Sequence, residues 1–354
     1  ITDRGLIPPA SVGAADAFVR NADKVIVELN ETIPGALYGM HDIYTAGDRP
    51  IPITSAADRI GTPYIPCPME KIAAVVLTND PGTYPSFKEP DDISLALSEN
   101  IVAFLKAEIA AGRQPKNLRP IQSGVGNVAN AVLAGLEKDF TGLSMYTEVM
   151  QDSAFELVKK GVITSGSATA LSLSEAMQRE LYDNIDFYKK HIVIRPQEIA
   201  NNPEVVRRMQ LIAMNTPIEV DIYGNVNSTH VMGTKIMNGI GGSGDFARNA
   251  GLTIFATGSL AKGGAISCVV PMVSHVDHTE HDVDVIVTDY GAADLRWKTP
   301  RERAKLIIEN CAHPDYRPQL REYFAEACAT SGGQTPHVLS KALSWHQRYV
   351  ETGS

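Results

Sequence analysis

The sequence lacks several features that define whole classes of protein. Its four cysteines, Cys67, Cys268, Cys311 and Cys328, are widely spaced and form no CxxC pair, which is typical of reduced thiols in an intracellular protein. No apolar run reaches the ~18 residues that a transmembrane helix needs. Acidic residues outnumber basic ones, and the formal net charge of −9 argues against broad binding to nucleic acids or membrane surfaces. Any phosphate group of a ligand must therefore be held by a local set of donors.

Internal repeats and low-complexity tracts are also absent. The 354 residues, of which 44% are apolar, are enough for two domains with sizeable cores. The first residue is Ile1, and the chain opens in a loop rich in proline and glycine over residues 5–13. We therefore expect the natural polypeptide to begin elsewhere.

Three short apolar segments, at 22–30, 50–54 and 72–80, are separated by turn-rich stretches and predict buried β-strands. They are typical of the closing strands of an α/β domain. Residues 81–92 are rich in proline, glycine and charged residues, which predicts a linker. We place a domain boundary there.

A long amphipathic helix is predicted directly after this linker. Asp91 or Asp92 is expected to cap it, and it should end at residues 111–112. Its apolar stripe recurs every four positions and consists of Ile93, Leu97, Ile101, Leu105 and Ile109. Such a stripe indicates one buried face.

Beyond this helix, apolar strands alternate with predicted helices at 127–137, 152–160 and 173–186. The alternation predicts an α/β fold with a mostly parallel sheet covered by helices on both faces. Ligands of such sheets bind beyond the carboxyl ends of the strands. Both the turn at 124–127 and Glu148 fall at such ends, so the topology brings them to one edge.

The turn at 124–127 joins a predicted strand to a helix. Gly124 and Gly126 leave its backbone N–H groups able to meet an anion or a developing oxyanion. The same pattern is equally typical of tight packing between a strand and a helix. A second glycine-rich turn at 239–246 shifts the balance toward ligand binding, because two such turns can supply opposed donors.

Three carboxylates compete for the role of an attacking group in covalent catalysis. Glu148 follows an apolar strand and is alternatively an exposed acid near the start of the next helix. Glu219 and Asp221 alternate in a strand, so their side chains point to one face. For this pair we favour hydrogen bonding to neighbouring loops, but the residues alone keep both candidates open.

The densest group of polar side chains lies near residue 280. Its members are His275, Asp277, His278, Glu280, His281, Asp282 and Asp284. This composition suits a zinc or iron site and makes a metal-dependent hydrolase a competing class. However, the segment leads into a strand, and no predicted helix places His278 and His281 on one face. We therefore favour a hydrogen-bonded loop.

Three further polar residues are candidate ligand contacts. Lys262 lies in the glycine-rich segment SLAKGG of an acidic chain, where it would suit a phosphate, although most lysines are solvated surface residues. Asn238 precedes the second glycine-rich turn and is a weaker candidate of the same kind. Asn127 either donates its side-chain amide to a ligand or caps the following helix.

Five blocks of sequence resemble the acetyl-CoA hydrolase/transferase family, the class I CoA-transferases, and within it the succinyl-CoA:acetate or acetate/propionate type. The blocks are QSGVGNVANAV at 122–132, YTEVMQD at 146–152, EVDIYGNVNSTHVMG at 219–233, GIGGSGDFARNA at 239–250 and HVDHTEHDVDVIVTDYGAADLR at 275–296. Together they span most of the chain from 120 to 325, which is too long a run for chance.

The resemblance implies two tandem CoA-transferase domains of the NagB/RpiA-like α/β type, with mostly parallel sheets. Residues 1–85 would form the C-terminal part of an incomplete first domain, and residues 91–354 the second domain with the catalytic glutamate. Family members are longer at the N-terminal end, so the N-terminal portion of the same enzyme is an expected partner. A homodimer is expected as well, cytoplasmic in a bacterium or mitochondrial in a eukaryote.

The resemblance also assigns roles to individual residues. It implies that Glu148 is the nucleophile and that backbone N–H groups near Val125 and Gly242 stabilise oxyanions. The expected CoA-binding residues are Gly124, Val125, Gly126, Asn127, Val128, Asn238, Gly242 and Lys262. No metal and no permanently bound cofactor is implied, because CoA is a substrate. Two departures from the family pattern are Asp289, where relatives usually carry Glu, and Trp297, which replaces a usual Gly.

The expected reaction moves CoA between a short-chain acyl-CoA, such as succinyl-, acetyl- or propionyl-CoA, and a carboxylate such as acetate. It would pass through a glutamyl-CoA thioester on Glu148. The alternatives are an acetyl-CoA hydrolase, a metal-dependent hydrolase that uses the polar residues between 275 and 284, and a non-catalytic CoA-binding fragment.

Overall fold

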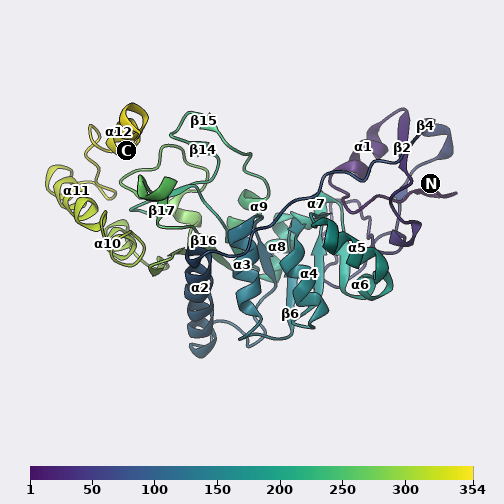
Figure 1. Cartoon of the computed structure of the whole chain (residues 1–354), viewed down its shortest axis with the longest axis horizontal. Coiled ribbons are helices and arrows are strands. Elements are labelled where there is room, and N and C mark those ends of the chain that lie inside the picture. The colour runs from purple at the N-terminus through teal and green to yellow at the C-terminus, as the bar shows by residue number, and fades with distance from the viewer. Residues whose placement is uncertain (354) are drawn as a thin grey trace. The chain divides into compact units, whose positions relative to one another are not determined.

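A computed structural model describes residues 1–353 (Figure 1). The chain forms two compact units, and each is described by itself. Unit 1 contains residues 1–88, 117–125 and 140–211, and unit 2 contains residues 89–116, 126–139 and 212 onward. The predicted boundary at 81–92 coincides with the first passage from unit 1 to unit 2. The assignment of family domains to residues 1–85 and 91–354 stays a prediction.

Unit 1 is built around four parallel strands in the order β10-β8-β6-β5. These strands are β5 (Ile121–Ser123), β6 (Leu143–Tyr146), β8 (Ile163–Ala168) and β10 (Ile192–Ile194). The helices of this unit are α1 (Ala15–Asn21), α4 (Asp152–Lys159), α5 (Glu175–Asp183), α6 (Ile185–His191), α7 (Gln197–Ala200) and α8 (Pro203–Met209). The alternation of parallel strands and helices confirms the predicted α/β class.

Shorter elements complete unit 1. They are β1 (Gly5–Leu6), β2 (Val25–Asn30), η1 (Gly35–Leu37), β3 (Ile65–Pro66), η2 (Met69–Lys71), β4 (Ile72–Thr78), β7 (Val149–Met150) and β9 (Ala170–Leu171). A buried ion pair joins Arg195, which follows β10, to Asp42 in the N-terminal segment. Both side chains are almost completely buried, so this pair ties the first 60 residues to the parallel strands.

The predicted strand at 50–54 is wrong, because the structure has a loop there. Pro50 and Pro52 lack the N–H groups that a strand ladder needs. Ile51 and Ile53 are nevertheless buried, and their carbonyl groups accept hydrogen bonds from Arg208. The alternation of apolar residues at 51 and 53 therefore indicates burial of the side chains and not strand pairing of the backbone.

The predicted helix at 173–186 is two helices, α5 and α6, which meet at Asn184. Asn184 has φ −119° and ψ 31°, outside the helical range. Asparagine favours such breaks, because its side chain offers the backbone other hydrogen bonds.

The strands predicted at 22–30 and 72–80 form as β2 and β4, but they are not buried. They pair in parallel with each other, next to α1 in Figure 1. Their apolar side chains remain largely exposed, with Ile26 at 70% and Leu77 at 63%. Two-stranded parallel pairs with bare apolar faces are unusual, since parallel sheets are normally covered on both sides.

Unit 2 contains the parallel strands β11, β16 and β20, with β21 antiparallel at their edge. Their bounds are β11 (Ile212–Asn215), β16 (Leu252–Ala256), β20 (Val285–Thr288) and β21 (Gly291–Asp294). A second, buried sheet has the order β13-β12-β19, with β12 (Glu219–Asp221), β13 (Val226–Asn227) and β19 (Val269–Val270). Two hairpins carry the remaining strands, β14 (His230–Val231) with β15 (Lys235–Ile236), and β17 (Leu260–Ala261) with β18 (Ile266–Ser267).

The helices of unit 2 are α2 (Asp92–Ala110), α3 (Asn127–Leu136), α9 (Ser243–Ala247), α10 (Pro300–Asn310), α11 (Arg317–Thr330) and α12 (Ser344–Thr352), with short turns η3 (Lys262–Gly264) and η4 (Glu280–Asp282). Asp91 caps α2 by accepting a hydrogen bond from Ser94 N, as predicted. α2 packs on α3, and a Cβ at Gly135 would lie 1.8 Å from Ser98 Oγ, so the two helices approach at a glycine. Figure 1 shows α10, α11 and α12 grouped together in the yellow part of the chain.

No helix among residues 1–353 is both long and apolar enough to span a membrane.

Candidate active site

Glu148 and the first glycine-rich turn lie at the ends of adjacent parallel strands in unit 1. β5 pairs in parallel with β6. Ser123 is the last residue of β5 and Thr147 directly follows β6, and Thr147 Oγ1 donates a hydrogen bond to Ser123 O at 3.0 Å. Gly124 and Glu148 therefore leave the sheet at the same edge, where ligands of parallel sheets bind.

The backbone of Glu148 is fixed by its neighbours beyond β8. Its carbonyl oxygen accepts hydrogen bonds from Thr169 N at 2.9 Å and Ala170 N at 3.2 Å. The following strand β7 then pairs with β9. The Glu148 side chain is partly exposed. A partly exposed carboxylate on a fixed strand end is suited to attack a bound substrate.

The turn after β5 has one position that requires glycine. Gly126 has φ 108° and ψ −178°, a conformation open almost only to glycine. The Val125 side chain, which is 57% exposed, points to solvent and does not pack over the turn. Asn127 is the first residue of α3, and Gly126 occupies the capping position. Val128 is the next residue of α3 and is half-buried.

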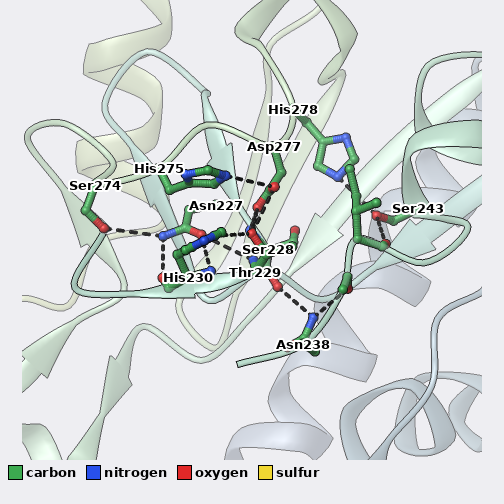
Figure 2. Close-up of polar contacts among 12 residues, drawn as sticks. Asn227, Ser228, Thr229, His230, Asn238, Ser243, Ser274, His275, Asp277 and His278 are labelled. Atoms are coloured by element: carbon green, nitrogen blue, oxygen red, sulfur yellow. Dashed lines mark hydrogen bonds and ion pairs between the residues drawn. The ribbon is translucent and has the colours of Figure 1, made fainter. Parts of the chain in front are cut away.

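In unit 2, Asn238 and Gly242 lie on one segment between β15 and α9, where Asn238 is exposed and Gly242 is buried. Asn238 Nδ2 donates to Ser228 O at 3.0 Å and to Gly239 O at 2.9 Å (Figure 2). Gly242 has an ordinary φ of −77°, whereas Gly241 has φ 58° and is the residue that needs glycine in this turn. Asn238 thus helps to shape the turn that carries Gly242.

Lys262 lies in the turn between β17 and β18. Three consecutive residues have positive φ, Lys262 at 51°, Gly263 at 66° and Gly264 at 97°. Tyr316 at the start of α11 donates from its hydroxyl to Gly264 O at 3.1 Å. The ring of Tyr316 contacts Trp345 of α12. The Lys262 turn is therefore strained and exposed, and besides the pairing of β17 with β18 it receives a hydrogen bond from the Tyr316 hydroxyl, a contact that the sequence did not reveal.

Asp289 anchors the start of the same segment. Its carboxylate accepts hydrogen bonds from Ser259 N at 2.6 Å and Ser259 Oγ at 3.1 Å. Asp289 follows β20 and Ser259 follows β16, so the bond joins the ends of two adjacent parallel strands. The shorter acid at this family position thus has a role in holding a loop. Trp297 is 98% exposed with φ 60°, and nothing in the structure explains its replacement of a glycine.

The competing carboxylates Glu219 and Asp221 are buried and fully engaged, as favoured from the sequence. Glu219 accepts hydrogen bonds from His346, Asn227 and Ser274. Burial pushes the pKa of Glu219 up, but the hydrogen bond and charge of His346, together with hydrogen bonds from Asn227 and Ser274, outweigh it and hold the pKa below its usual value.

Asp221 accepts from the backbone N–H groups of residues 223, 224 and 225, which closes a turn after β12. Burial raises the pKa of Asp221 to about 6. Asp221 and Glu219 are both buried, whereas Glu148 is partly exposed.

The polar residues between His275 and Asp284 form a hydrogen-bonded loop. Asp277 binds Ser228 and Thr229, Asp282 pairs with Arg248, and Asp284 accepts from Thr253 N. Among residues 1–353, no group of three or more His, Cys, Asp or Glu side chains is arranged to hold a metal ion. The geometry gives the metal-dependent hydrolase no support.

Comparison with known proteins decides the family. Residues 178–324 match the family model described as the acetyl-CoA hydrolase/transferase C-terminal domain. Succinyl-CoA:acetate CoA-transferase of Clostridium kluyveri is 59% identical over 360 residues, which cover 100% of this chain and 67% of that protein. The chain belongs to the acetyl-CoA hydrolase/transferase family.

Two further family members carry different names. Propanoyl-CoA:succinate CoA transferase of Escherichia coli is 46% identical, with 98% of this chain and 71% of that protein covered. Acetyl-CoA hydrolase of Schizosaccharomyces pombe is 43% identical, with 99% and 70% covered. The family therefore contains both transferases and hydrolases under closely related sequences.

Solved structures show the same fold. RipA from Yersinia pestis has a TM-score of 0.71 at 24% identity and covers 91% of this chain and 67% of that chain. 4-Hydroxybutyrate CoA-transferase from Porphyromonas gingivalis has a TM-score of 0.63 at 24% identity, with 90% and 70% covered. The prediction of a CoA-transferase-like α/β fold with mostly parallel sheets is confirmed.

Proposed function

We propose that this chain is the part of a CoA-transferase that carries the nucleophile, and that Glu148 exchanges CoA between a short-chain acyl-CoA and a carboxylate. Family membership supports the reaction class, since relatives are named for succinyl-CoA with acetate and for propanoyl-CoA with succinate. The observation that carries the residue assignment is the position of Glu148 at the end of β6, beside the glycine turn that ends β5.

The proposed chemistry has two matched halves. A Glu148 carboxylate oxygen attacks the thioester carbonyl, and collapse of the tetrahedral adduct gives a mixed anhydride and CoA thiolate. The thiolate then attacks the Glu148 carbonyl carbon of the anhydride, which forms a glutamyl-CoA thioester and releases the acyl group as a carboxylate. An acceptor carboxylate reverses these steps and leaves as the new acyl-CoA.

Each half passes through an oxyanion that needs hydrogen-bond donors. We assign this task to backbone N–H groups near Val125 and Gly242, in the two glycine-rich turns. The exposed side chain of Val125 supports close approach of a substrate to the first turn. The assignment of Gly242, which is buried, follows from the family resemblance.

The CoA-binding residues in this proposal follow from the family resemblance. They are Gly124, Val125, Gly126, Asn127, Val128, Asn238, Gly242 and Lys262. Lys262 supplies the positive charge for a phosphate, which matters in a chain of net charge −9. CoA enters this scheme as a substrate.

Hydrolysis is the second candidate function, because six relatives at 42–43% identity are named acetyl-CoA hydrolase. Both reactions begin with formation of the glutamyl-CoA thioester on Glu148. They differ in whether water or a carboxylate then attacks that thioester. The ratio of acyl-CoA loss with and without added acetate separates them.

The decisive experiment traps the intermediate. The full-length polypeptide is incubated with acyl-CoA, and intact mass and peptide mapping should find CoA attached to Glu148, with borohydride converting the thioester to an alcohol. Glu148→Gln should abolish both the adduct and the transfer, whereas Glu175→Gln, an exposed control on α5, should retain both. An adduct that persists in Glu148→Gln would overturn the assignment.

We further propose that the N-terminal portion of the same enzyme covers the bare apolar faces of β2 and β4. The exposed Ile26, Val76 and Leu77 support this, as does the alignment of this chain with 67% of the length of the Clostridium relative. Residues 1–354 expressed alone should be poorly soluble or inactive, and co-expression with the remaining portion should restore activity. Full turnover by the isolated chain, free of any companion fragment by mass, would refute this proposal.

A further inference from the structure

The segment 228–243 of unit 2 begins at the buried Ser228 and Thr229, is exposed over residues 234–241, and becomes buried again at Gly242, directly before α9. Its hairpin, β14 with β15, contains two residues per strand. Ile236 and Met237 are largely exposed, and Gly239, Gly241 and Gly242 follow. Such a segment has little packing of its own, so the position of its glycine turn depends on how its two ends are held.

Asp277 holds the first end. Its Oδ2 accepts hydrogen bonds from Ser228 N at 2.7 Å and from Thr229 Oγ1 at 2.8 Å, and Figure 2 shows the carboxylate between this backbone and His275. His275 Nε2 lies 3.4 Å from the other carboxylate oxygen. The Asp277 side chain is 7% exposed. Bonds from N–H and O–H donors to a buried carboxylate are among the stronger hydrogen bonds in proteins.

His278 holds the second end. Its Nε2 lies 3.1 Å from Ser243 Oγ, and the hydroxyl of Ser243 donates to Ile240 O at 2.8 Å. Because the single hydroxyl proton goes to Ile240, His278 must donate through Nε2–H. Burial lowers the pKa of His278, against the pull of the nearby Asp277 and Asp282, so the ring is neutral at pH 7.

The backbone of both residues is itself anchored. Asp277 N and His278 N donate to Val226 O at 2.9 and 3.1 Å, and Val226 N donates to His278 O at 2.8 Å. Val226 belongs to β13 in the buried sheet β13-β12-β19. Asp277 and His278, both bonded to the buried strand β13, thus form hydrogen bonds with the two ends of segment 228–243.

We propose that Asp277 and His278 are positioning residues that clamp both ends of segment 228–243 and thereby fix the glycine turn that carries Gly242 for catalysis. The inference rests on the proposed role of Gly242. The composition of the polar loop near residue 280 suggested a metal site. In this proposal the loop has a positioning role instead, because the Asp277 carboxylate and the His278 imidazole form hydrogen bonds with backbone and hydroxyl groups of segment 228–243.

The test combines kinetics with amide hydrogen exchange on the full-length enzyme. Asp277→Ala, and the milder Asp277→Asn, should speed amide exchange across 238–242 and lower kcat by about 10- to 100-fold, as expected for misplaced groups, with a smaller change in KM. Ser243→Ala removes the His278 bond together with the Ser243–Ile240 bond, so His278→Phe, which leaves the second bond in place, is measured beside it, and both should show the same pattern. Asp282→Asn, on the same loop but paired with Arg248, is the matched control and should change neither quantity.

Two results would overturn the proposal. If exchange across 238–242 is unchanged in Asp277→Ala and Ser243→Ala, then these residues do not clamp the segment. If exchange rises while kcat stays at the wild-type value, the turn is clamped but takes no part in the reaction. That second result would remove Gly242 from the proposed site, while CoA trapping on Glu148 tests the nucleophile independently.

Discussion

Tyr316→Phe removes one hydroxyl group from unit 2 and with it the hydrogen bond to Gly264 O at 3.1 Å. The aromatic ring remains, so its contact with Trp345 is retained. The only intended change is release of the turn that carries Lys262. If Lys262 meets a CoA phosphate, the change should weaken binding of acyl-CoA and leave the carboxylate acceptor unaffected.

The size of the effect follows from the turn. A neutral hydrogen bond contributes a net ~0.5–1.5 kcal/mol, which corresponds to a change of about 2- to 13-fold in an equilibrium constant. Lys262 has φ 51°, and a residue with a Cβ loses roughly 1–2 kcal/mol in this region. Other conformations of the turn are therefore close in free energy. Since apparent affinity falls with the population of the competent state, KM for acyl-CoA should rise by up to about 13-fold.

A double-mutant cycle supplies the assay. KM for acyl-CoA and for the carboxylate is measured in wild type, Tyr316→Phe, Lys262→Ala and the double variant. Tyr316→Phe should have no further effect once Lys262 is absent, because it acts through that side chain. Tyr349→Phe, a tyrosine that lines the same small cavity as Tyr316, is the control. Equal increases in both KM values, or additive effects in the double variant, would refute the reasoning.

Three further predictions concern charge, packing and the second turn. Glu108→Gln should lower the free energy of unfolding at pH 7 by about 3 kcal/mol, because hydrogen bonds from Arg296 lead the causes that depress the pKa of Glu108 from 4.5 to about 2. This stabilisation is complete above pH 4.5 and is lost as the pH falls toward 2, so the wild-type and variant curves should converge there, and parallel curves would contradict the argument. Arg195→Met should lower the free energy of unfolding, measured by urea titration, by about 3–5 kcal/mol, since it leaves the Asp42 carboxylate buried without the Arg195 guanidinium. Asp42→Asn in that background should recover part of the loss, and a loss below about 1 kcal/mol would show that the pair is not needed. Gly242→Val should reduce kcat far more than stability, because the added side chain would block approach to the backbone N–H groups, and an unchanged kcat would exclude the turn from the active site.

Local signals in the sequence predicted the parts of the fold that depend on neighbouring residues. The cap at Asp91 and the buried middle of the predicted stripe, Leu97, Ile101 and Leu105, involve positions three or four apart, so periodicity alone finds them. The first member of the stripe, Ile93, is 41% exposed, so the prediction was wrong at that end of α2. The adjacency of Gly124 and Glu148 was also predictable, because consecutive parallel strands place their carboxyl ends at one edge.

The sequence predictions were wrong where the burial of side chains does not coincide with strand pairing of the backbone. Ile51 and Ile53 have the alternation of a strand and are buried, yet Pro50 and Pro52, which precede each of them, leave the segment without a ladder. β2 and β4 have the composition of buried strands but expose Ile26 and Leu77, because burial depends on elements that pack on them and not on the strands themselves.

The contacts that shape the candidate site lay beyond sequence reasoning for a different reason. Tyr316 reaches Gly264 across 52 positions, and Asp277 reaches Ser228 across 49. No periodicity connects such pairs, and tyrosine and aspartate are common on surfaces. Only the packing of the β17–β18 hairpin against α11, and of the 275–278 loop against β13, brings the partners together.

The polar loop near residue 280 shows why a cluster of acidic and histidine residues in a sequence need not contain the reacting groups. Transfer through a glutamyl thioester needs one carboxylate and several backbone donors, and backbone donors leave no trace in composition except glycine. Their precision must come from other residues, which have to be buried and hydrogen-bonded in order to be rigid. Asp277 and His278 have these properties, whereas Glu148 is partly exposed. In the proposed mechanism, the acids and histidines near residue 280 therefore support a backbone site and do not form a site in their own right.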